Sequence, residues 1–108
     1  MLVDKARQKL LGSESEKDFA LKFEQLLKLK HWAFYHVYEQ SSYAHRSTSG
    51  FPDYLIFRDK FMLAVELKRE SGQLTANQIA WKFVLEEAEV PYYCWRPSDW
   101  EEIEKVLE

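Results

Sequence analysis

The sequence predicts a single α/β domain in which helices flank a mixed β-sheet, in the order α-β-β-β-α-β-α. Two observations lead to this prediction. The chain has 108 residues, of which 46% are hydrophobic and 16% aromatic, which is enough apolar volume for one packed core and too little for two. Segments with the three-and-four spacing of helices also alternate with short β-favouring runs. We therefore expect one domain over residues 1–108.

The N-terminal part of the chain is predicted to be helical. Residues 1–12 can hold a short extra helix, which Gly12 stops. A second helix is expected to begin near Ser13 or Ser15 and to run to about Lys30. Its apolar residues recur at three-and-four spacing, at Phe19, Phe23, Leu26 and Leu27.

Three strands are expected in the middle of the chain. Residues 32–38 are aromatic and β-favouring, which predicts a strand, and the polar, serine-rich residues 40–49 predict a surface loop that Gly50 closes. Residues 53–57 and 61–68 are two further β-favouring runs. The connection between them is short enough for an antiparallel hairpin, so these two strands should be neighbours in the sheet.

A capping box predicts the next helix. Thr75 is followed three residues later by Gln78, the pattern in which each side chain bonds the other residue's backbone at a helix N-terminus. The helix should reach about Ala88. We expect its apolar residues to pack on the sheet, namely Ile79, Trp81, Phe83, Val84 and Leu85.

The C-terminal part should hold one more strand and one more helix. Residues 90–95 are β-favouring and predict the strand. Ser98 and Glu101 form a second capping-box pattern, which predicts a terminal helix that continues to the end of the chain.

Composition limits the setting in which the protein works. Cys94 is the only cysteine, which excludes an internal disulfide and a multi-cysteine zinc site, and no signal-like or bilayer-spanning run is present. We therefore expect a soluble, cytoplasmic protein without a membrane partner. The net charge of −3 argues weakly against a nucleic-acid partner. A local basic face is still available, because cations gather in the middle of the chain, at Arg46, Lys68, Arg69, Lys82 and Arg96.

Acidic and basic side chains meet in the predicted hairpin. Asp53 begins one strand, and Glu66 and Lys68 end its antiparallel partner, so the three residues should lie at the same end of the pair. Because side chains alternate along a strand, Glu66 and Lys68 share one face, while Val65 and Leu67 point to the other, which should be the core. A charged face is therefore expected where a central strand should be apolar.

Such a group of charges is costly unless it is paired or binds a metal ion. Mg²⁺, or Mn²⁺ in its place, prefers carboxylate and carbonyl oxygens, so Asp53, Glu66 and the backbone carbonyl of Leu67 can form a partial shell. A metal there activates water and neutralises charge on a scissile phosphate, and Lys68 can orient that water or stabilise the same charge. This pattern indicates phosphodiester hydrolysis. The competing interpretation is a simple Glu66–Lys68 salt bridge on an exposed sheet face.

Four motifs occur in a fixed order from roughly Ser15 to the C-terminus. They are Gly50-Phe51-Pro52-Asp53, Val65-Glu66-Leu67-Lys68, Gly72-x-Leu74-x-x-x-Gln78 and Trp95-Arg96-Pro97. Together they resemble the VRR-NUC nucleases of the PD-(D/E)XK superfamily. The resemblance implies a restriction-endonuclease-like fold and a stand-alone domain of phage or bacterial type, which would work in the cytoplasm of a bacterial or phage-infected cell.

The resemblance also implies roles for individual residues. In that family the proline-associated aspartate and the glutamate of E-x-K bind divalent metal, the lysine assists hydrolysis and a glutamine lies at the site. These roles fall here on Asp53, Glu66, Lys68 and Gln78. The family has a further glutamate on its first helix, in a Ser/Thr-Glu-x-x-aromatic setting. The matching stretch Ser15-Glu16-Lys17-Asp18-Phe19 implies Glu16 as a catalytic and metal-site residue.

Two of these residues also have a local explanation. Gln78 completes a capping box with Thr75 without any catalytic need, and Glu16 stands three residues after Ser13, which is again a capping-box pattern. The sequence leaves both interpretations of Gln78 open. The resemblance favours Glu16 as a site residue.

The remaining candidates are weaker. His36 is a lone histidine in an aromatic strand, which is more typical of a hydrogen-bonded core residue than of a metal ligand. Arg96 is a candidate for contact with DNA phosphates, or can pair with an acid of the last helix. The other candidates for phosphate contact are His45, Arg46 and Arg69. Trp81, Trp95 and Trp100 are expected in the core or an interface rather than stacked on bases.

The function expected from the sequence is that of a Mg²⁺- or Mn²⁺-dependent endodeoxyribonuclease. A domain of this size offers little surface for gripping DNA, so we expect a homodimer that brings two active sites to two strands of branched DNA, such as a four-way junction. The alternative is a catalytically silent module with a nuclease-like fold that binds nucleic acid or another protein.

Overall fold

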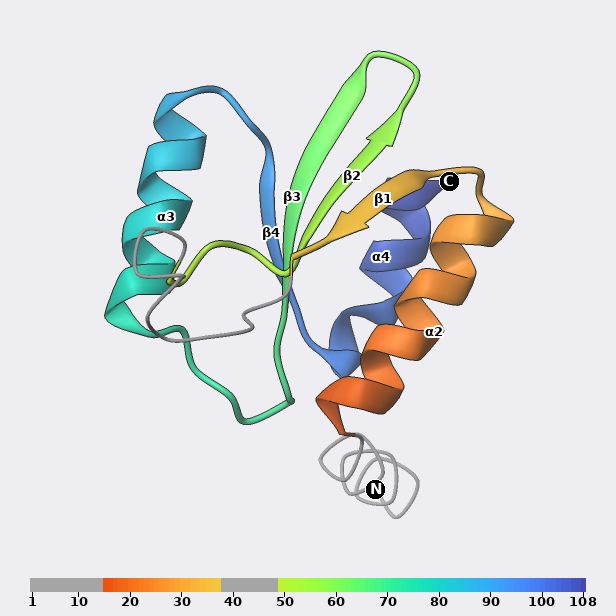
Figure 1. Cartoon of the computed structure of the whole chain (residues 1–108). Helices are drawn as coiled ribbons and strands as arrows, with labels where there is room; N and C mark the ends of the chain where they lie inside the picture. Colours follow the sequence, from red (N-terminus) through yellow and green to blue (C-terminus); the bar gives the residue numbers. More distant parts are fainter. Residues whose placement is uncertain (1–14, 38–48) are drawn as a thin grey trace.

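A computed structural model describes residues 15–37 and 49–108 of the chain. In these residues the chain forms an α/β fold with a four-stranded mixed sheet and three α-helices (Figure 1). The elements are α2 (Glu16–Leu29), β1 (Ala33–His36), β2 (Tyr54–Arg58), β3 (Phe61–Leu67), α3 (Ala76–Glu87), β4 (Tyr92–Trp95), the short 3-10 helix η1 (Pro97–Asp99) and α4 (Trp100–Leu107). The predicted element order is confirmed, and the helix expected within residues 1–12 lies outside the described residues.

The sheet has the strand order β1-β2-β3-β4. β1 pairs with β2 and β2 with β3 in antiparallel fashion, whereas β4 runs parallel to β3. In the β2–β3 hairpin, Tyr54 stands opposite Val65, so the start of β2 and the end of β3 lie at the same edge of the sheet. The predicted hairpin is therefore confirmed, and it brings residues far apart in the sequence to one place.

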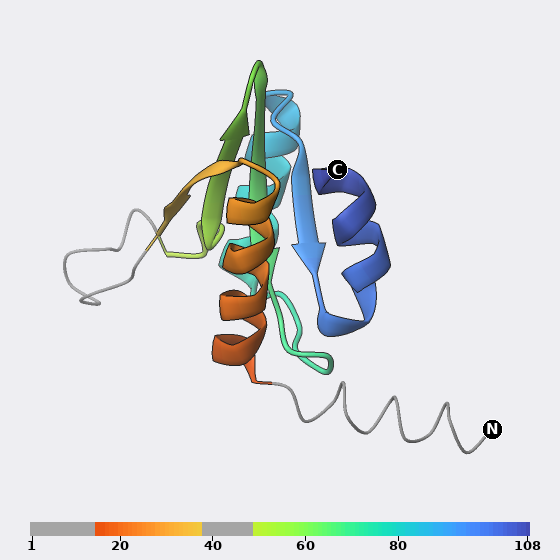
Figure 2. The same ribbon diagram turned by 90° about the vertical axis from the view of Figure 1, so that its right-hand side faces the viewer.

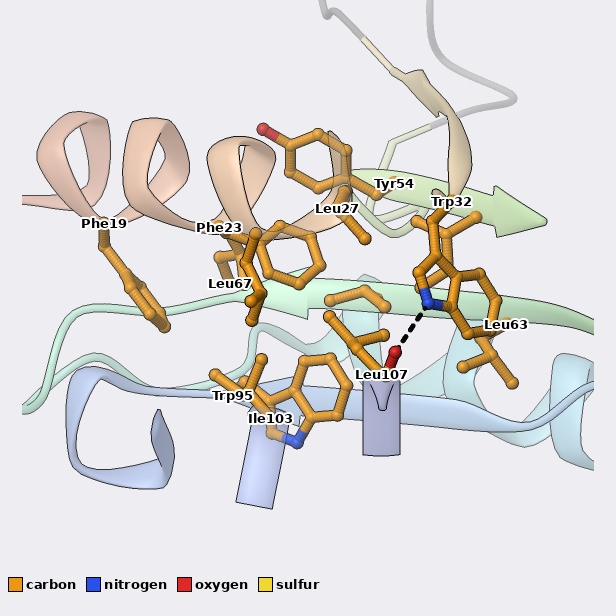
Figure 3. Close-up of a cluster of buried hydrophobic side chains, with 13 residues drawn as sticks. Phe19, Phe23, Leu27, Trp32, Tyr54, Leu63, Leu67, Trp95, Ile103 and Leu107 are labelled. Carbon is orange, nitrogen blue, oxygen red and sulfur yellow. Dashed lines mark hydrogen bonds between the residues drawn. The ribbon is translucent and has the colours of Figure 1, made fainter. Parts of the chain in front are cut away.

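Helices cover the two faces of the sheet unequally. Figures 1 and 2 show α2 and α4 on one face and α3 on the other. The main core lies between the sheet and the α2/α4 pair, and Figure 3 shows its side chains interdigitating. Its fully buried members include Phe19, Phe23, Leu27, Ile56, Val65, Trp95, Ile103 and Leu107. Alternation along β3 therefore sends Leu63, Val65 and Leu67 into this core and Ala64 and Glu66 toward the α3 side.

The C-terminal helix is tied to the start of the sheet. The indole Nε1 of Trp32 donates a hydrogen bond of 3.0 Å to the carbonyl of Leu107 (Figure 3). Arg58 stacks on the Trp32 ring and donates to the carbonyl oxygens of Lys30 and Leu107, both at 2.9 Å. The guanidinium thus satisfies free carbonyls at the ends of α2 and α4, where a cation is also favoured by the helix dipole.

Two details of the helices differ from the sequence prediction. The apolar residues of α3 do not all pack on the sheet: Leu85 is buried, but Ile79, Phe83 and Val84 are exposed because α3 packs beside β4 with one narrow face. The capping box predicted at Ser98 and Glu101 is also wrong. There the carboxylate of Asp99 accepts from the backbone N–H of Arg96, η1 intervenes, and α4 begins at Trp100.

No helix in the described part of the chain is both long enough and apolar enough to span a membrane.

Candidate active site

Asp53 lies immediately before β2, three residues after Gly50. The surface loop predicted at residues 40–49 lies almost entirely outside the described residues. The Oδ2 atom of Asp53 accepts a hydrogen bond of 2.9 Å from the backbone N–H of Leu67, the last residue of β3. Its own carbonyl accepts from the N–H of Val37, the residue after β1, so Asp53 is held from both sides. Pro52 is buried next to it. The carboxylate is therefore fixed at the sheet edge by its neighbours.

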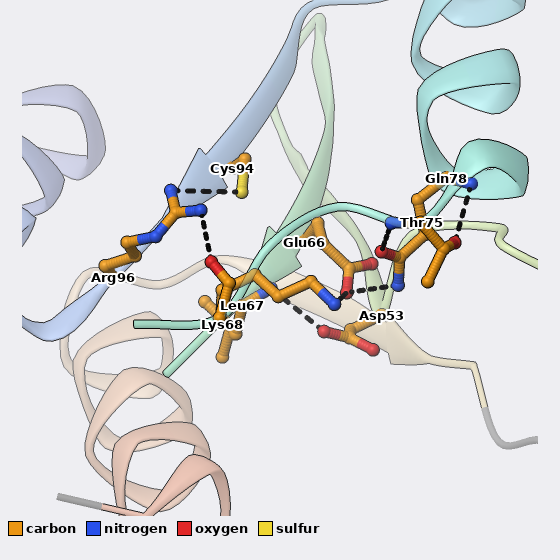
Figure 4. Close-up of polar contacts among 9 residues, drawn as sticks. Asp53, Glu66, Leu67, Lys68, Thr75, Gln78, Cys94 and Arg96 are labelled. Atoms are coloured by element: carbon orange, nitrogen blue, oxygen red, sulfur yellow. Dashed lines mark hydrogen bonds and ion pairs between the residues drawn. The ribbon is translucent and has the colours of Figure 1, made fainter. Parts of the chain in front are cut away.

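Glu66 is the buried charge of the site. Only 3% of the residue is exposed, and it is the one buried charged or polar residue among those described. Its Oε2 lies 4.0 Å from Nζ of Lys68 and accepts a hydrogen bond of 3.2 Å from Nε2 of Gln78 (Figure 4). Its Oε1 is buried and has no hydrogen-bond partner in the described residues. A buried carboxylate oxygen without a partner is costly, which makes it a candidate ligand atom.

Gln78 serves two purposes at once. Its Oε1 accepts from the backbone N–H of Thr75 at 2.8 Å, and the Thr75 hydroxyl accepts from the N–H of Gln78, so the capping box is present. Its Nε2 reaches Glu66. The two interpretations left open by the sequence are therefore compatible, because the cap holds the glutamine with its amide nitrogen directed to the carboxylate.

Gly50 sets the approach of the Asp53 loop to α3. Its φ is +83°, and a Cβ at this position would lie 2.5 Å from the backbone carbon of Asn77 and 2.7 Å from the nitrogen of Gln78. Both the backbone conformation and the space require glycine. The loop that carries Asp53 and the helix that carries Gln78 are therefore in backbone contact.

The electrostatics of the two carboxylates are unusual. Burial, and next the repulsion of Asp53, raise the pKa of Glu66 to about 8, although Lys68 opposes the shift. Burial likewise raises the pKa of Asp53, although the Leu67 N–H partly stabilises the charged form. Two acids that resist ionisation side by side are typical of a site completed by a cation.

Glu16 lies near this pair without joining it. It is the first residue of α2, and the N-cap is Ser15, whose hydroxyl accepts from the N–H of Asp18 at 3.1 Å. Glu16 therefore does not occupy the third helical position that a capping box needs, and the competing local explanation is wrong. Its carboxylate lines a pocket together with Asp53 and raises the pKa of that residue.

The described residues contain no group of three His, Cys, Asp or Glu side chains that could hold a metal ion. Asp53 and Glu66 remain as a pair. Mg²⁺ is commonly held by one or two carboxylates and otherwise by water and substrate phosphates, so two acids with an unpartnered buried oxygen fit this ion. The Leu67 N–H is bonded to Asp53, so the backbone of Leu67, whose carbonyl is the predicted third ligand, lies beside this carboxylate.

The predicted DNA-contacting residues have different positions. Arg69 is exposed in the connection after β3. Arg96 is not: its Nη2 donates to the carbonyl of Gly72 at 2.7 Å, and its Nη1 lies 3.8 Å from Sγ of Cys94 (Figure 4). The side chain thus braces the loop between Lys68 and α3 and pairs with no acid of α4. His45 and Arg46 lie outside the described residues.

The tryptophans pack as expected. Trp95 is 1% exposed, and its Nε1 donates to Glu102 at 2.6 Å. Trp100 stands edge-on to Phe19, and Trp81 edge-on to Phe51.

His36 is placed differently from its expected core position. It is half-buried on the wall of the pocket beside Asp53, its ring stacks on Tyr54, and its Nδ1 lies 3.9 Å from Oε2 of Glu24. Glu24 was not identified from the sequence. The signal available was weak: Glu16 and Glu24 are eight residues apart and so share one face of α2.

No protein-family model, no curated protein and no solved structure matches this chain.

Proposed function

We propose that this protein is a Mg²⁺- or Mn²⁺-dependent endodeoxyribonuclease with a restriction-endonuclease-like arrangement, as its resemblance to the VRR-NUC family implies. The observation that carries the proposal is the convergence of Asp53, Lys68 and Gln78 on the buried Glu66 (Figure 4). A salt bridge on an exposed sheet face does not explain this group, because Glu66 is buried and one of its oxygens has no partner within the described residues.

In this proposal, each residue of the site has its own role in hydrolysis. Asp53 and Glu66 hold the metal, which supplies activation of water and neutralisation of phosphate charge. Gln78 holds Glu66 through Nε2 and is itself held by its cap. Lys68, whose side chain is largely buried, donates a hydrogen bond from its ammonium to the attacking water or to a phosphate oxygen. Glu16 lines the same pocket as Asp53, and its negative charge favours cations there.

A homodimer acting on branched DNA is part of the proposal. The α3 side of the molecule exposes six large apolar side chains, three on the sheet and three on α3. They are Tyr35, Phe57, Met62, Ile79, Phe83 and Val84, which we call the outer apolar face. Together they expose on the order of 600 Å², which approaches the roughly 800 Å² that each partner contributes to a stable interface. A second copy on this face would place two active sites on one DNA substrate.

Cleavage assays test the proposed activity. Labelled four-way-junction, flap and linear duplex DNA are incubated with Mg²⁺, Mn²⁺ or chelator. We expect metal-dependent cutting that Asp53→Asn and Lys68→Ala each lower by at least about 100-fold. Asp59→Asn and Lys60→Ala are matched controls, because both residues are exposed at the opposite end of the same hairpin. Circular dichroism verifies that all variants fold equally.

The opposite result is equally informative. If the wild type binds these substrates but cuts none of them with either metal, the nuclease proposal fails, and a silent nucleic-acid-binding module takes its place. If it neither binds nor cuts, and metal does not change its thermal stability, the charged site is a protein-docking surface.

A further inference from the structure

A pocket of about 480 Å³ adjoins the candidate active site. It lies between one face of α2 and the ends of β1 and β2. Asp53 and Glu16 line it, and so do residues that the proposed chemistry does not use, namely Ala20, Leu21, Glu24 and His36. Glu16 and Glu24 are two turns apart, about 12 Å along the helix axis, so the pocket extends well beyond the metal-binding carboxylates.

The far part of the pocket contains an ordered polar network. The hydroxyl of Tyr54, which points to α2 in Figure 3, donates to Oε2 of Glu24. Nδ1 of His36 lies 3.9 Å from the same oxygen, and the imidazole stacks on the Tyr54 ring with centroids 4.4 Å apart. In the described part of the chain, Oε1 of Glu24 accepts no hydrogen bond. The network therefore fixes one oxygen of a carboxylate that lines the pocket and leaves the other available as an acceptor.

Charge and shape restrict what this pocket can bind. Glu16, Glu24 and Asp53 give it a negative potential, which disfavours phosphate inside it. Ala20 and Leu21 supply apolar wall against which a flat ring can pack. Its volume is in the range of small-molecule pockets, which is large enough for one nucleobase and far too small for a duplex. A carboxylate acceptor beside an apolar wall is suited to an amino-bearing ring.

We infer that this pocket receives one unstacked nucleobase next to the scissile phosphate, and that Glu24 accepts a hydrogen bond from its exocyclic amino group. Adenine, cytosine and guanine carry such a group and thymine does not. The inference rests on the proposed nuclease function and narrows its substrate to DNA with an unpaired nucleotide at the cut. Glu24 is here a base-binding residue, and Tyr54 and His36 position its carboxylate.

Cleavage with a scanned base tests this inference. The substrate is a flap DNA whose unpaired arm is all thymidine except for one dC, dA or dG, moved through the positions on each side of the mapped cut. We expect the amino-bearing bases to raise kcat/KM about tenfold over thymidine at one position. Glu24→Ala should reduce this preference to less than twofold. Asp18→Asn, which removes a carboxylate from α2 outside the pocket, should preserve it.

A binding measurement tests the inference independently of cleavage. DNA that carries 2-aminopurine at the preferred position is titrated with protein in chelator. If no cutting occurs, the probe is placed in turn at each position beside the branch. We expect its fluorescence to rise as the base unstacks into the pocket, and the rise to be lost in Glu24→Ala but retained in Glu24→Gln, whose amide oxygen still accepts. Circular dichroism shows whether Glu24→Ala is folded. Glu24→Gln is the second variant, because its amide nitrogen can donate to the Tyr54 hydroxyl while its amide oxygen serves the base.

The outcomes separate the two proposals. Metal-dependent cleavage with no base preference at any position, and no change in fluorescence, overturns the pocket assignment while the nuclease proposal stands. Fluorescence that rises and depends on Glu24, without cleavage by either metal, supports the pocket and overturns the nuclease. A rise that is equal in wild type and Glu24→Ala places the unstacked base elsewhere and also overturns the assignment.

Discussion

The backbone N–H of Leu67 donates a hydrogen bond of 2.9 Å to Oδ2 of Asp53, so the residue before β2 is fixed to the last residue of β3. This bond crosses the hairpin at the point where Glu66 is buried. It holds Asp53 close enough for its charge to raise the pKa of Glu66. The hairpin thus supports an electrostatically unfavourable pair of acids that a bound cation would relieve.

The first prediction concerns the pH dependence of stability in the absence of metal. The pKa of Glu66 is raised from 4.5 to about 8 on folding. The folded state therefore binds a proton more tightly than the unfolded state, and the resulting stability is complete below pH 4.5 and lost as the pH rises to about 8. We expect the free energy of unfolding, measured with urea in chelator, to fall by about 2–4 kcal/mol between pH 5 and pH 8.5.

Variants and metal separate this effect from general titration. Glu66→Gln should remove most of the fall, and Mg²⁺ should restore wild-type stability at pH 8.5 because it binds the ionised carboxylates. Glu87→Gln, an exposed acid on α3, should retain the full fall. Equal pH profiles for wild type and Glu66→Gln would show that Glu66 ionises normally.

The sequence could predict this part of the site because local rules place it. Alternation along residues 61–67 separates Glu66 from Val65, and the short turn at Asp59 fixes the register that brings Asp53 to Leu67. The capping rule located Gln78, although only the packing of α3 beside β4 directs its Nε2 to Glu66.

The rest of the site depends on tertiary contacts that no short-range pattern encodes. Glu24 meets Tyr54 across thirty residues of sequence, because α2 lies over β2 in the folded core. Arg96 meets the carbonyl of Gly72 because β4 is parallel to β3, a pairing that needs a crossover through α3. His36 was expected in the core, since the sequence does not show that this end of β1 borders a pocket.

The second prediction concerns Gly50. A side chain here must adopt a φ of +83° and overlap the backbone at Asn77. We expect Gly50→Ala to lower the free energy of unfolding by about 2–4 kcal/mol and to lower cleavage further than this loss explains, because Asp53 and Gln78 move apart. Gly72→Ala is the control, since its Cβ would come no closer than 3.3 Å to Arg69 O. Similar losses in both variants would contradict the close-approach argument.

The third prediction distinguishes two arginines. Arg96 braces the loop after Lys68 through Gly72, whereas Arg69 is exposed beside it. Arg96→Ala should therefore lower kcat about tenfold and leave DNA affinity and its salt dependence nearly unchanged. Arg69→Ala should weaken binding to all sequences and reduce the slope of log affinity against log salt by about 1. Arg96→Lys should recover part of the kcat, because an ammonium can still donate to the Gly72 carbonyl.

Titrations at several salt concentrations measure these slopes. A slope reduced by about 1 in Arg96→Ala would contradict the bracing role and show that Arg96 contacts phosphate, as the sequence suggested.

The fourth prediction concerns assembly. Phe83 is 64% exposed on α3 and Tyr35 is equally exposed on the sheet, whereas Leu29, at 70%, ends α2 on the opposite side of the molecule. We expect light scattering to give twice the mass of one chain for the wild type and for Leu29→Glu, and the mass of a single chain for Phe83→Glu, because a charge in an apolar interface is poorly solvated. Cleavage of four-way junctions should decrease in the variant that no longer forms the dimer.

A monomeric wild type at working concentration would remove the paired-site arrangement and make a flap or a single nick the expected substrate. A dimer that persists in Phe83→Glu would place the interface away from the outer apolar face.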